Sequence, residues 1–176
     1  MDKREILQEE FSNKNVEYLK KNKRGYNDIA MRVGKTINAI HTINKLKCKK
    51  ILVLYPDLKI KDSWIGDLAK LGLSEDNYTF SHYMSVKKCT DNYTIVILDE
   101  FPEASEAQKN NVISLIDKLD CYVLGLSGTV SEESRLLAEN ELNMKEIVKY
   151  SAEQAIQDGI ISNYQVTVHS VPLDNT

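Results

Sequence analysis

Three short apolar runs, each ended by polar or turn-forming residues, constrain the fold of this chain more than any other feature. The runs occupy residues 50–55, 93–98 and 122–126. Continuous apolar runs of this length are typical of strands that are buried on both faces, as in a parallel sheet. We therefore expect these three segments to be central strands of one sheet.

Amphipathic helical patterns alternate with the apolar runs. Apolar residues recur at helical spacing in residues 36–46, 58–71 and 106–119. Strands that alternate with helices predict an α/β domain with a mostly parallel sheet flanked by helices. In such a sheet, ligands bind at the carboxyl ends of the strands.

The remaining segments have weaker patterns. Residues 4–21 carry an imperfect helical stripe, which predicts either one helix or two short helices broken near Asn13. Residues 24–27 form a turn signal and residues 28–31 resemble a short strand. Residues 78–83 predict a further, weaker strand.

Composition excludes several classes of protein. A chain of 176 residues, 42% hydrophobic and 28% charged, suits one ordered domain. The net charge of −3 neither supports nor excludes nucleic-acid binding, and the cysteines and histidines form no metal-type spacing. Because no segment approaches the roughly eighteen apolar residues of a membrane span, we expect a soluble, cytoplasmic protein (in the host cytoplasm if viral) without a membrane partner.

Gly34, Lys35 and Thr36 stand between the short strand and the first long helix. This order of residues is the phosphate-binding end of a P-loop, in which backbone N–H groups and a lysine contact phosphates and the hydroxyl helps to hold Mg²⁺. The full pattern has a glycine at the position of Ile29, and Arg32 stands where glycine is frequent. Taken alone, the tripeptide is therefore equally compatible with an ordinary helix start.

Asp99 and Glu100 directly follow the second apolar run. An aspartate at the end of a buried strand can hold the Mg²⁺ that Thr36 also contacts, and a neighbouring glutamate can orient and deprotonate a water molecule. The alternative is that these acidic residues stabilise the N-terminus of a helix. The P-loop residues earlier in the chain favour the catalytic interpretation.

Ser127, Gly128 and Thr129 follow the third apolar run. Their hydroxyl groups either cap the next helix or respond to the state of the γ-phosphate. Polar residues thus follow several strands at the point where each strand ends. This repeated placement is the strongest indication of a functional site in the sequence.

Together these residues resemble the first RecA-like motor domain of a superfamily-two helicase or translocase, of phage-like, Swi/Snf or DEAD/DEAH type. The segments that carry the resemblance are residues 30–37, 51–56, 63–64, 81–83, 96–100, 125–129 and 155–168. The resemblance implies a RecA-like P-loop domain over residues 1–172, with a helical lead-in at 1–25, and no second motor domain in this chain. Trp64 is expected to be a core residue rather than a base-stacking one.

The resemblance also implies the site. The residues expected to bind ATP are Gly34, Lys35, Thr36, Arg32, Val33 and Gln8, the last as a reader of adenine. Thr36 and Asp99 would hold Mg²⁺, and Glu100 would act in catalysis with Asp99 and Lys35. Ser127 and Thr129 would couple hydrolysis to movement along nucleic acid, with DNA expected rather than RNA, and a second RecA-like domain would be the partner in cis or in trans.

The sequence departs from the family pattern at two places. Pro102 stands where the family usually has His or Asp, and Val130 replaces a common proline. Two alternatives therefore remain open. The chain is either another kind of P-loop NTPase or a non-catalytic module whose degenerate loop no longer holds ATP.

Overall fold

The structure, a computed structural model, describes residues 1–162. Its elements, in which η marks a 3-10 helix, are α1 (Lys3–Asn22), β1 (Arg24–Ile29), α2 (Lys35–Lys45), β2 (Ile51–Tyr55), α3 (Leu58–Lys70), β3 (Tyr78–His82), η1 (Tyr83–Lys88), β4 (Ile95–Asp99), η2 (Phe101–Glu103), α4 (Glu106–Lys118), β5 (Tyr122–Ser127), α5 (Glu132–Asn140), β6 (Lys145–Tyr150) and α6 (Ala152–Gln157). The long helices and the three apolar strands agree with the prediction to within about two residues.

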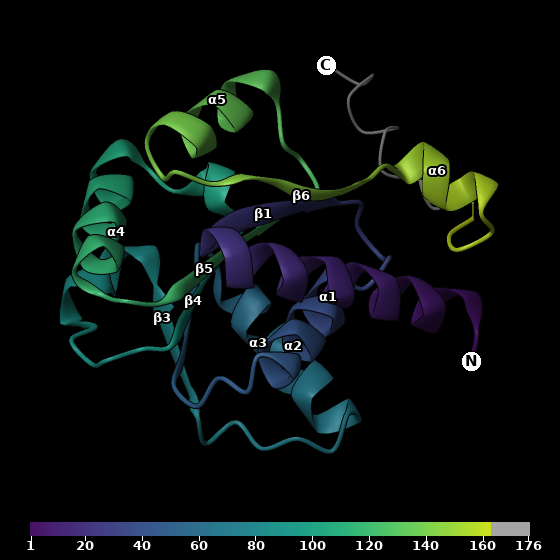
Figure 1. Ribbon diagram of the computed structural model, residues 1–176, viewed down its shortest axis with the longest axis horizontal. Helices are drawn as coiled ribbons and strands as arrows, with labels where there is room; N and C mark the ends of the chain where they lie inside the picture. The colour runs from purple at the N-terminus through teal and green to yellow at the C-terminus, as the bar shows by residue number, and fades with distance from the viewer. Residues whose placement is uncertain (163–176) are drawn as a thin grey trace.

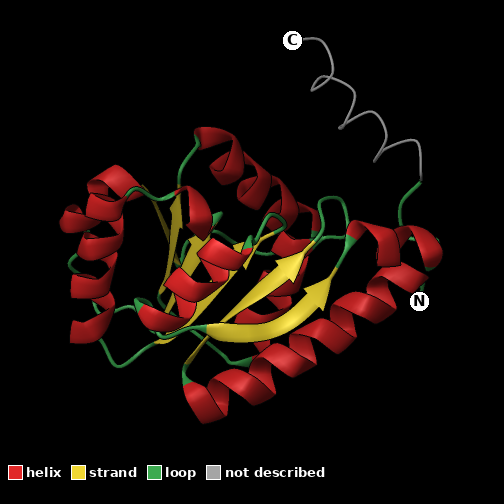
Figure 2. Ribbon diagram, turned by 90° about the horizontal axis from the view of Figure 1, so that it is seen from above, coloured by secondary structure: helices red, strands yellow, loops and turns green. Residues whose placement is uncertain are grey.

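The six strands form one sheet in the order β3-β2-β4-β5-β1-β6. Every pair of neighbours is parallel. This arrangement confirms the predicted α/β fold, and Figure 2 shows the strands side by side between layers of helices. Because β5 lies between β4 and β1, the ends of β1 and β4 are two strand spacings, about 10 Å, apart.

Helices cover both faces of the sheet (Figure 1). Helices α1, α2 and α3 cover one face and contribute Leu19, Ile40 and Leu68 to its core. Helices α4 and α5 cover the other face, where Ile116 and Ala138 are buried. The central strands are therefore shielded from water on both sides, which explains why they are continuously apolar.

The prediction for residues 24–27 was wrong. They form the first part of β1 rather than a turn. Gly25 leaves room for β6, because a Cβ atom at this position would lie 2.5 Å from Ile147 Cδ1 and would force that side chain to shift. Asn27 is fully buried in the strand, where its side chain is hydrogen-bonded. Because this strand contains a glycine and a buried asparagine, its sequence lacks the apolar pattern by which a buried strand is recognised.

A buried polar network joins α1, β1 and α2. Asn15 Nδ2 donates hydrogen bonds to Asn27 Oδ1 (2.9 Å) and to Thr42 Oγ1 (3.1 Å). Asn27 Nδ2 donates to Asn15 Oδ1 at 2.7 Å, and Asn38 Nδ2 donates to Asn27 Oδ1 at 3.2 Å. All four residues are at most 1% exposed. The network fixes the strand before the P-loop and the helix after it against α1.

Helix α1 is continuous, so the alternative of a break near Asn13 was wrong. Its start is stabilised by a capping box in which Asp2 accepts a hydrogen bond from the Glu5 backbone and the Glu5 side chain accepts one from the Asp2 backbone. Asn13 lies on the helix surface and accepts a hydrogen bond from Lys45 Nζ at 2.9 Å. Contacts with α2 and the sheet thus outweigh the low helix propensity of asparagine.

Strand β6 and helix α6 were not predicted. β6 is the edge strand beside β1, and Lys145, Glu146 and Lys149 are exposed on it. Charged residues are frequent on edge strands because they discourage pairing with another chain, and they also hide the strand signal. Within the segment 155–168, which carried part of the resemblance, residues 163–168 lie outside the described residues.

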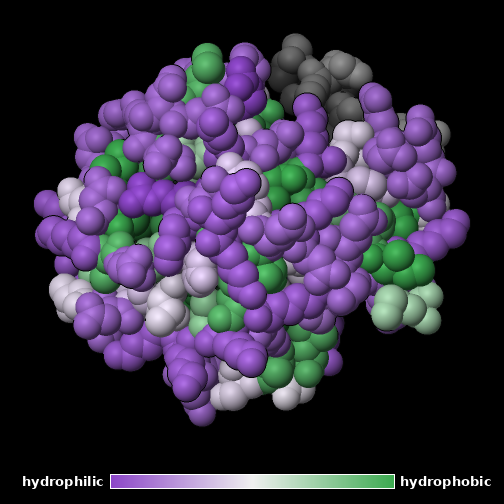
Figure 3. Space-filling view, in the orientation of Figure 1, coloured by the Kyte–Doolittle hydropathy of each residue, from purple (hydrophilic) through white to green (hydrophobic). Residues whose placement is uncertain are grey.

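The surface of the described part is mostly hydrophilic. Figure 3 shows small, separate groups of hydrophobic residues on the face that it presents. Within residues 1–162, no helix has both the length and the apolar character that a membrane span requires.

The polar network predicts a selective effect of Asn15→Ala. The substitution removes two donated hydrogen bonds and leaves the Asn27 amide without its acceptor, so the free energy of unfolding should fall by about 2 kcal/mol. Asn44→Ala, at an exposed position of α2, is the control and should change stability little. Urea unfolding of both variants measures the difference, and equal stabilities would contradict a structural role for the network.

Candidate functional site

The loop between β1 and α2 turns sharply at two residues. Gly34 has φ 105° and Arg32 has φ 71°, so both adopt left-handed backbone conformations. Arg32 thus takes a conformation that glycine usually supplies, at a cost of about 1–2 kcal/mol. The backbone can therefore follow the path of a P-loop although arginine stands at this position instead of glycine.

No side chain caps the N-terminus of α2, whose N-cap residue is Gly34. A side chain caps each of the other α-helices in residues 1–162, and these caps are Asp2, Asp57, Ser105, Ser131 and Ser151. The first N–H groups of a helix need an acceptor, and an anion can provide one. The start of α2 is thus the helix end best suited to phosphate.

Gln8 on α1 packs directly against this loop. A Cβ atom added to Gly34 would clash with the amide end of the Gln8 side chain, and Gln8 is 7% exposed. The left-handed backbone conformation of Gly34 favours glycine, whereas the end of the Gln8 side chain would only need to shift to admit a Cβ atom. The neighbouring Val33 is buried in the core, so only its backbone is available to a ligand.

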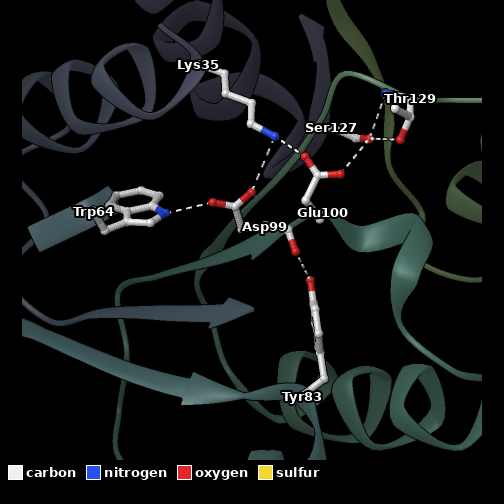
Figure 4. A network of polar contacts seen from close by, with 7 residues as sticks. All are labelled: Lys35, Trp64, Tyr83, Asp99, Glu100, Ser127 and Thr129. Atoms are coloured by element: carbon white, nitrogen blue, oxygen red, sulfur yellow. Dashed lines mark hydrogen bonds and ion pairs between the residues drawn. The ribbon is translucent and has the colours of Figure 1, made fainter. Parts of the chain in front are cut away.

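Lys35 extends from the start of α2 to two carboxylates at the end of β4 (Figure 4). Its Nζ atom forms an ion pair with Glu100 Oε1 and lies 3.7 Å from Asp99 Oδ1. The Lys35 and Asp99 side chains are 19% and 1% exposed. Three residues that sequence analysis assigned to one site are thus in mutual contact, although β5 lies between their strands.

The two carboxylate oxygens of Asp99 have different environments. Oδ2 accepts a hydrogen bond of 2.7 Å from the Trp64 indole Nε1. Oδ1 is buried and has no hydrogen-bond partner. Burial raises the pKa of Asp99 above its ordinary value, whereas Lys35 and the hydrogen bond from Trp64 lower it. A buried oxygen without a donor is well suited to contact a cation.

Glu100 has φ 46° and ψ 48°, a left-handed conformation that costs about 1–3 kcal/mol in a residue other than glycine. Its Oε2 atom lies 3.5 Å from Ser127 Oγ at the end of β5. Ser127 Oγ also accepts a hydrogen bond from the Thr129 backbone N–H and lies 3.2 Å from Thr129 Oγ1. The hydroxyl groups after β5 therefore form a chain of polar contacts that ends at Glu100.

A magnesium ion would need ligands from beyond the protein. Among residues 1–162, no group of three or more His, Cys, Asp or Glu side chains could hold a metal ion. Mg²⁺ is commonly bound by one or two protein ligands together with the phosphates of a substrate. Thr36, in the first turn of α2, and Asp99 Oδ1 fit this requirement.

Solved structures with a similar fold were found, all at low sequence identity. The Type ISP restriction-modification enzyme LlaGI in complex with a DNA substrate mimic has a TM-score of 0.67 and 15% identity, over 92% of this chain and 21% of that one. The Sulfolobus solfataricus SWI2/SNF2 ATPase core domain has a TM-score of 0.62 and 17% identity, over 76% and 32%. The UvsW helicase from bacteriophage T4 has a TM-score of 0.61 and 17% identity, over 78% and 58%.

The chain has a RecA-like α/β fold, similar to that of these solved helicase and ATPase cores. No family model matches its sequence, and no curated protein matches it significantly. The RecA-like domain spans 21%, 32% and 58% of the three solved chains. The comparisons thus show the fold, and the activity has to be argued from the site.

Sequence analysis also missed a hydrogen bond of Tyr83 and a pocket beside the P-loop. The Tyr83 hydroxyl donates a hydrogen bond of 2.8 Å to the Asp99 backbone oxygen, although Tyr83 had been expected only as the last residue of a weak strand and of one segment that carries the resemblance. A pocket of about 510 Å³ also lies beside the P-loop, where Met31, Thr129 and Lys149 are among the lining residues. It was missed because β6 was not predicted. The lining residues do not include Lys35, Asp99 or Glu100.

The ion pair predicts how Lys35→Ala changes the pH dependence of stability. A carboxyl group whose pKa is raised in the folded state binds more protons there than in the unfolded state, so stability falls as the pH rises from the ordinary value of 3.8 through the folded pKa. Removing Lys35 raises the pKa of Asp99 further. The fall in stability should therefore extend to higher pH in the variant than in the wild type.

Urea unfolding at a series of pH values measures this effect. Lys49→Ala, at an exposed position before β2, is the matched control and should keep the wild-type profile. Identical pH profiles for Lys35→Ala and Lys49→Ala would show that Lys35 does not balance the charge of Asp99.

Proposed function

We propose that residues 1–172 form the ATP-binding motor domain of a nucleic-acid helicase or translocase. The observation that carries this proposal is the contact of Lys35, at the uncapped start of α2, with Asp99 and Glu100 at the end of β4. A P-loop lysine beside two strand-end carboxylates is the arrangement that phosphoryl transfer to water requires. The similar fold of helicase and ATPase cores supports the same conclusion.

In this proposal, the start of α2 binds the phosphates of ATP. The N–H groups of Gly34, Lys35 and Thr36 would face phosphate oxygens, with Arg32 and Val33 contributing through the loop that they form. The charge of Lys35 would move from Glu100 to the β- and γ-phosphates. Gln8, which packs against Gly34, would contact the adenine.

Asp99 and Thr36 would hold Mg²⁺ together with phosphate oxygens. The buried Oδ1 atom of Asp99, which has no hydrogen-bond donor, is the protein atom that best fits the ion. When bound, Mg²⁺ neutralises charge that develops on the phosphates. Asp99 is held by Trp64, so its carboxylate needs little rearrangement to accept the ion.

Glu100 would act as the base that orients the attacking water and takes its proton. Release from Lys35 on ATP binding would free its carboxylate for this task. Ser127 and Thr129 would then sense the change at Glu100, because their hydroxyl groups continue the same chain of contacts. This chain offers a direct route from hydrolysis to the loop after β5.

DNA is the proposed track, and a second RecA-like domain is the proposed partner. Three of the structures with a similar fold are described as bound to DNA, in complex with double-stranded DNA or in complex with a DNA substrate mimic. Lys35, Asp99 and Glu100 lie together at the carboxyl ends of the strands, and a second domain, in cis or in trans, would pack over this end of the sheet. We place the protein in the cytoplasm, away from membranes.

The phosphate-binding role predicts different outcomes for two substitutions. A ligand that binds only the folded state stabilises it by about 2.7 kcal/mol at one hundred times its Kd. Mg-ATP should therefore raise the Tm of the wild type and of Glu100→Gln, but not that of Lys35→Ala. In the intact enzyme, Glu100→Gln should bind ATP and fail to hydrolyse it, because the base is absent.

Thermal-shift measurements at millimolar Mg-ATP provide the readout, with Lys49→Ala as the control for loss of a lysine. A wild-type Tm that does not respond to Mg-ATP would favour the alternative of a non-catalytic module. An equal rise of Tm in Lys35→Ala and the wild type would contradict the role of the P-loop.

A further inference from the structure

We propose that Trp64 is a positioning residue for the cation-binding carboxylate of Asp99. The proposal rests on the proposed function, since it concerns how this chain presents Asp99 to Mg²⁺. Trp64 lies on α3. From the sequence, it was expected to serve only as a core residue. Its hydrogen bond to Asp99 gives it a second role.

The indole is fixed in place by its surroundings. Trp64 is fully buried, and its ring lies 6.2 Å from the Tyr78 ring and 6.5 Å from the Phe80 ring, measured between centroids. Its Nε1–H group donates to Asp99 Oδ2 at 2.7 Å. A rigid donor of this kind restricts rotation of the carboxylate much more than a water molecule would.

This restriction selects the oxygen that is available to a ligand. With Oδ2 occupied by the indole, Oδ1 is the oxygen that lies near Lys35 and has no hydrogen-bond donor (Figure 4). Asp99 would therefore bind a cation through one oxygen, in a defined direction. Mg²⁺ demands near-ideal octahedral geometry, so the direction of each ligand affects its affinity.

Tyr83 provides a natural comparison for Trp64. It is also buried and also donates to Asp99, but its hydroxyl bonds to the backbone oxygen at 2.8 Å. Tyr83→Phe therefore removes a buried hydrogen bond from the same residue without changing the contacts of the carboxylate. Trp64→Phe removes the hydrogen bond to the carboxylate and keeps an aromatic ring in the core.

The first experiment titrates Mg²⁺ into the protein with mant-ATP, a fluorescent ATP analogue. It measures the midpoint, which is the Mg²⁺ concentration at which Mg²⁺-dependent binding of mant-ATP is half complete. Loss of a residue that orients a metal ligand typically weakens metal affinity by about 10- to 100-fold, so the Trp64→Phe midpoint should rise by roughly tenfold or more. Tyr83→Phe should keep a midpoint near the wild-type one. Binding of mant-ATP without Mg²⁺ should be the same in all three proteins.

The second experiment needs no variant of Trp64 and no activity. Trp64 is the only tryptophan of the chain, so a proton–nitrogen correlation spectrum contains a single indole N–H signal. Saturating Mg²⁺ with mant-ATP should shift this signal in the wild type. In Asp99→Asn, the signal should start from a different position and should not respond to Mg²⁺.

The outcomes separate this proposal from the proposed function. A Trp64→Phe midpoint equal to that of the wild type, or an indole signal unmoved by saturating Mg²⁺ and mant-ATP, overturns the role of Trp64 and leaves ATP binding intact. If Trp64→Phe does not fold, the indole signal of the wild type decides. Absence of mant-ATP binding by the wild type overturns both proposals.

Discussion

The buried charge of Asp99 is the constraint on which the arrangement of this site depends. A carboxylate that is 1% exposed is costly unless hydrogen bonds and an opposite charge compensate for it. Lys35 provides the charge, and Trp64 and Tyr83 bond to the side chain and the backbone of the same residue. Elements on both sides of β4 therefore converge on one acidic residue, and the P-loop helix is one of them.

The parts of the fold that sequence analysis predicted are those whose signal is local. The apolar runs that became β2, β4 and β5 are recognisable because both faces of these strands are buried. Strands β1 and β6 lack this pattern for opposite reasons. Asn27 is polar but is satisfied by residues of two helices, whereas Lys149 is charged because the edge of the sheet is exposed. Neither cause can be found in the strand's own sequence.

The candidate site was predicted as a set of residues but not as a set of contacts. Placement after parallel strands was enough to expect Lys35, Asp99 and Glu100 at the same edge of the sheet. The hydrogen bond from Trp64 could not be expected, because it depends on how α3 is rotated against β4. The left-handed conformation of Arg32 was likewise unforeseen, since it is imposed by the loop rather than favoured by arginine.

The central position of β5 has a consequence for synthesis of the protein on the ribosome. Within the described sheet, β5 alone pairs with both β4 and β1, yet it follows them in the chain. Until Ser127 has emerged, a growing chain can pair β2, β3 and β4 but has no strand to join them to β1. The P-loop and the strand-end carboxylates are thus joined through the sheet only after residues 122–127 have been synthesised.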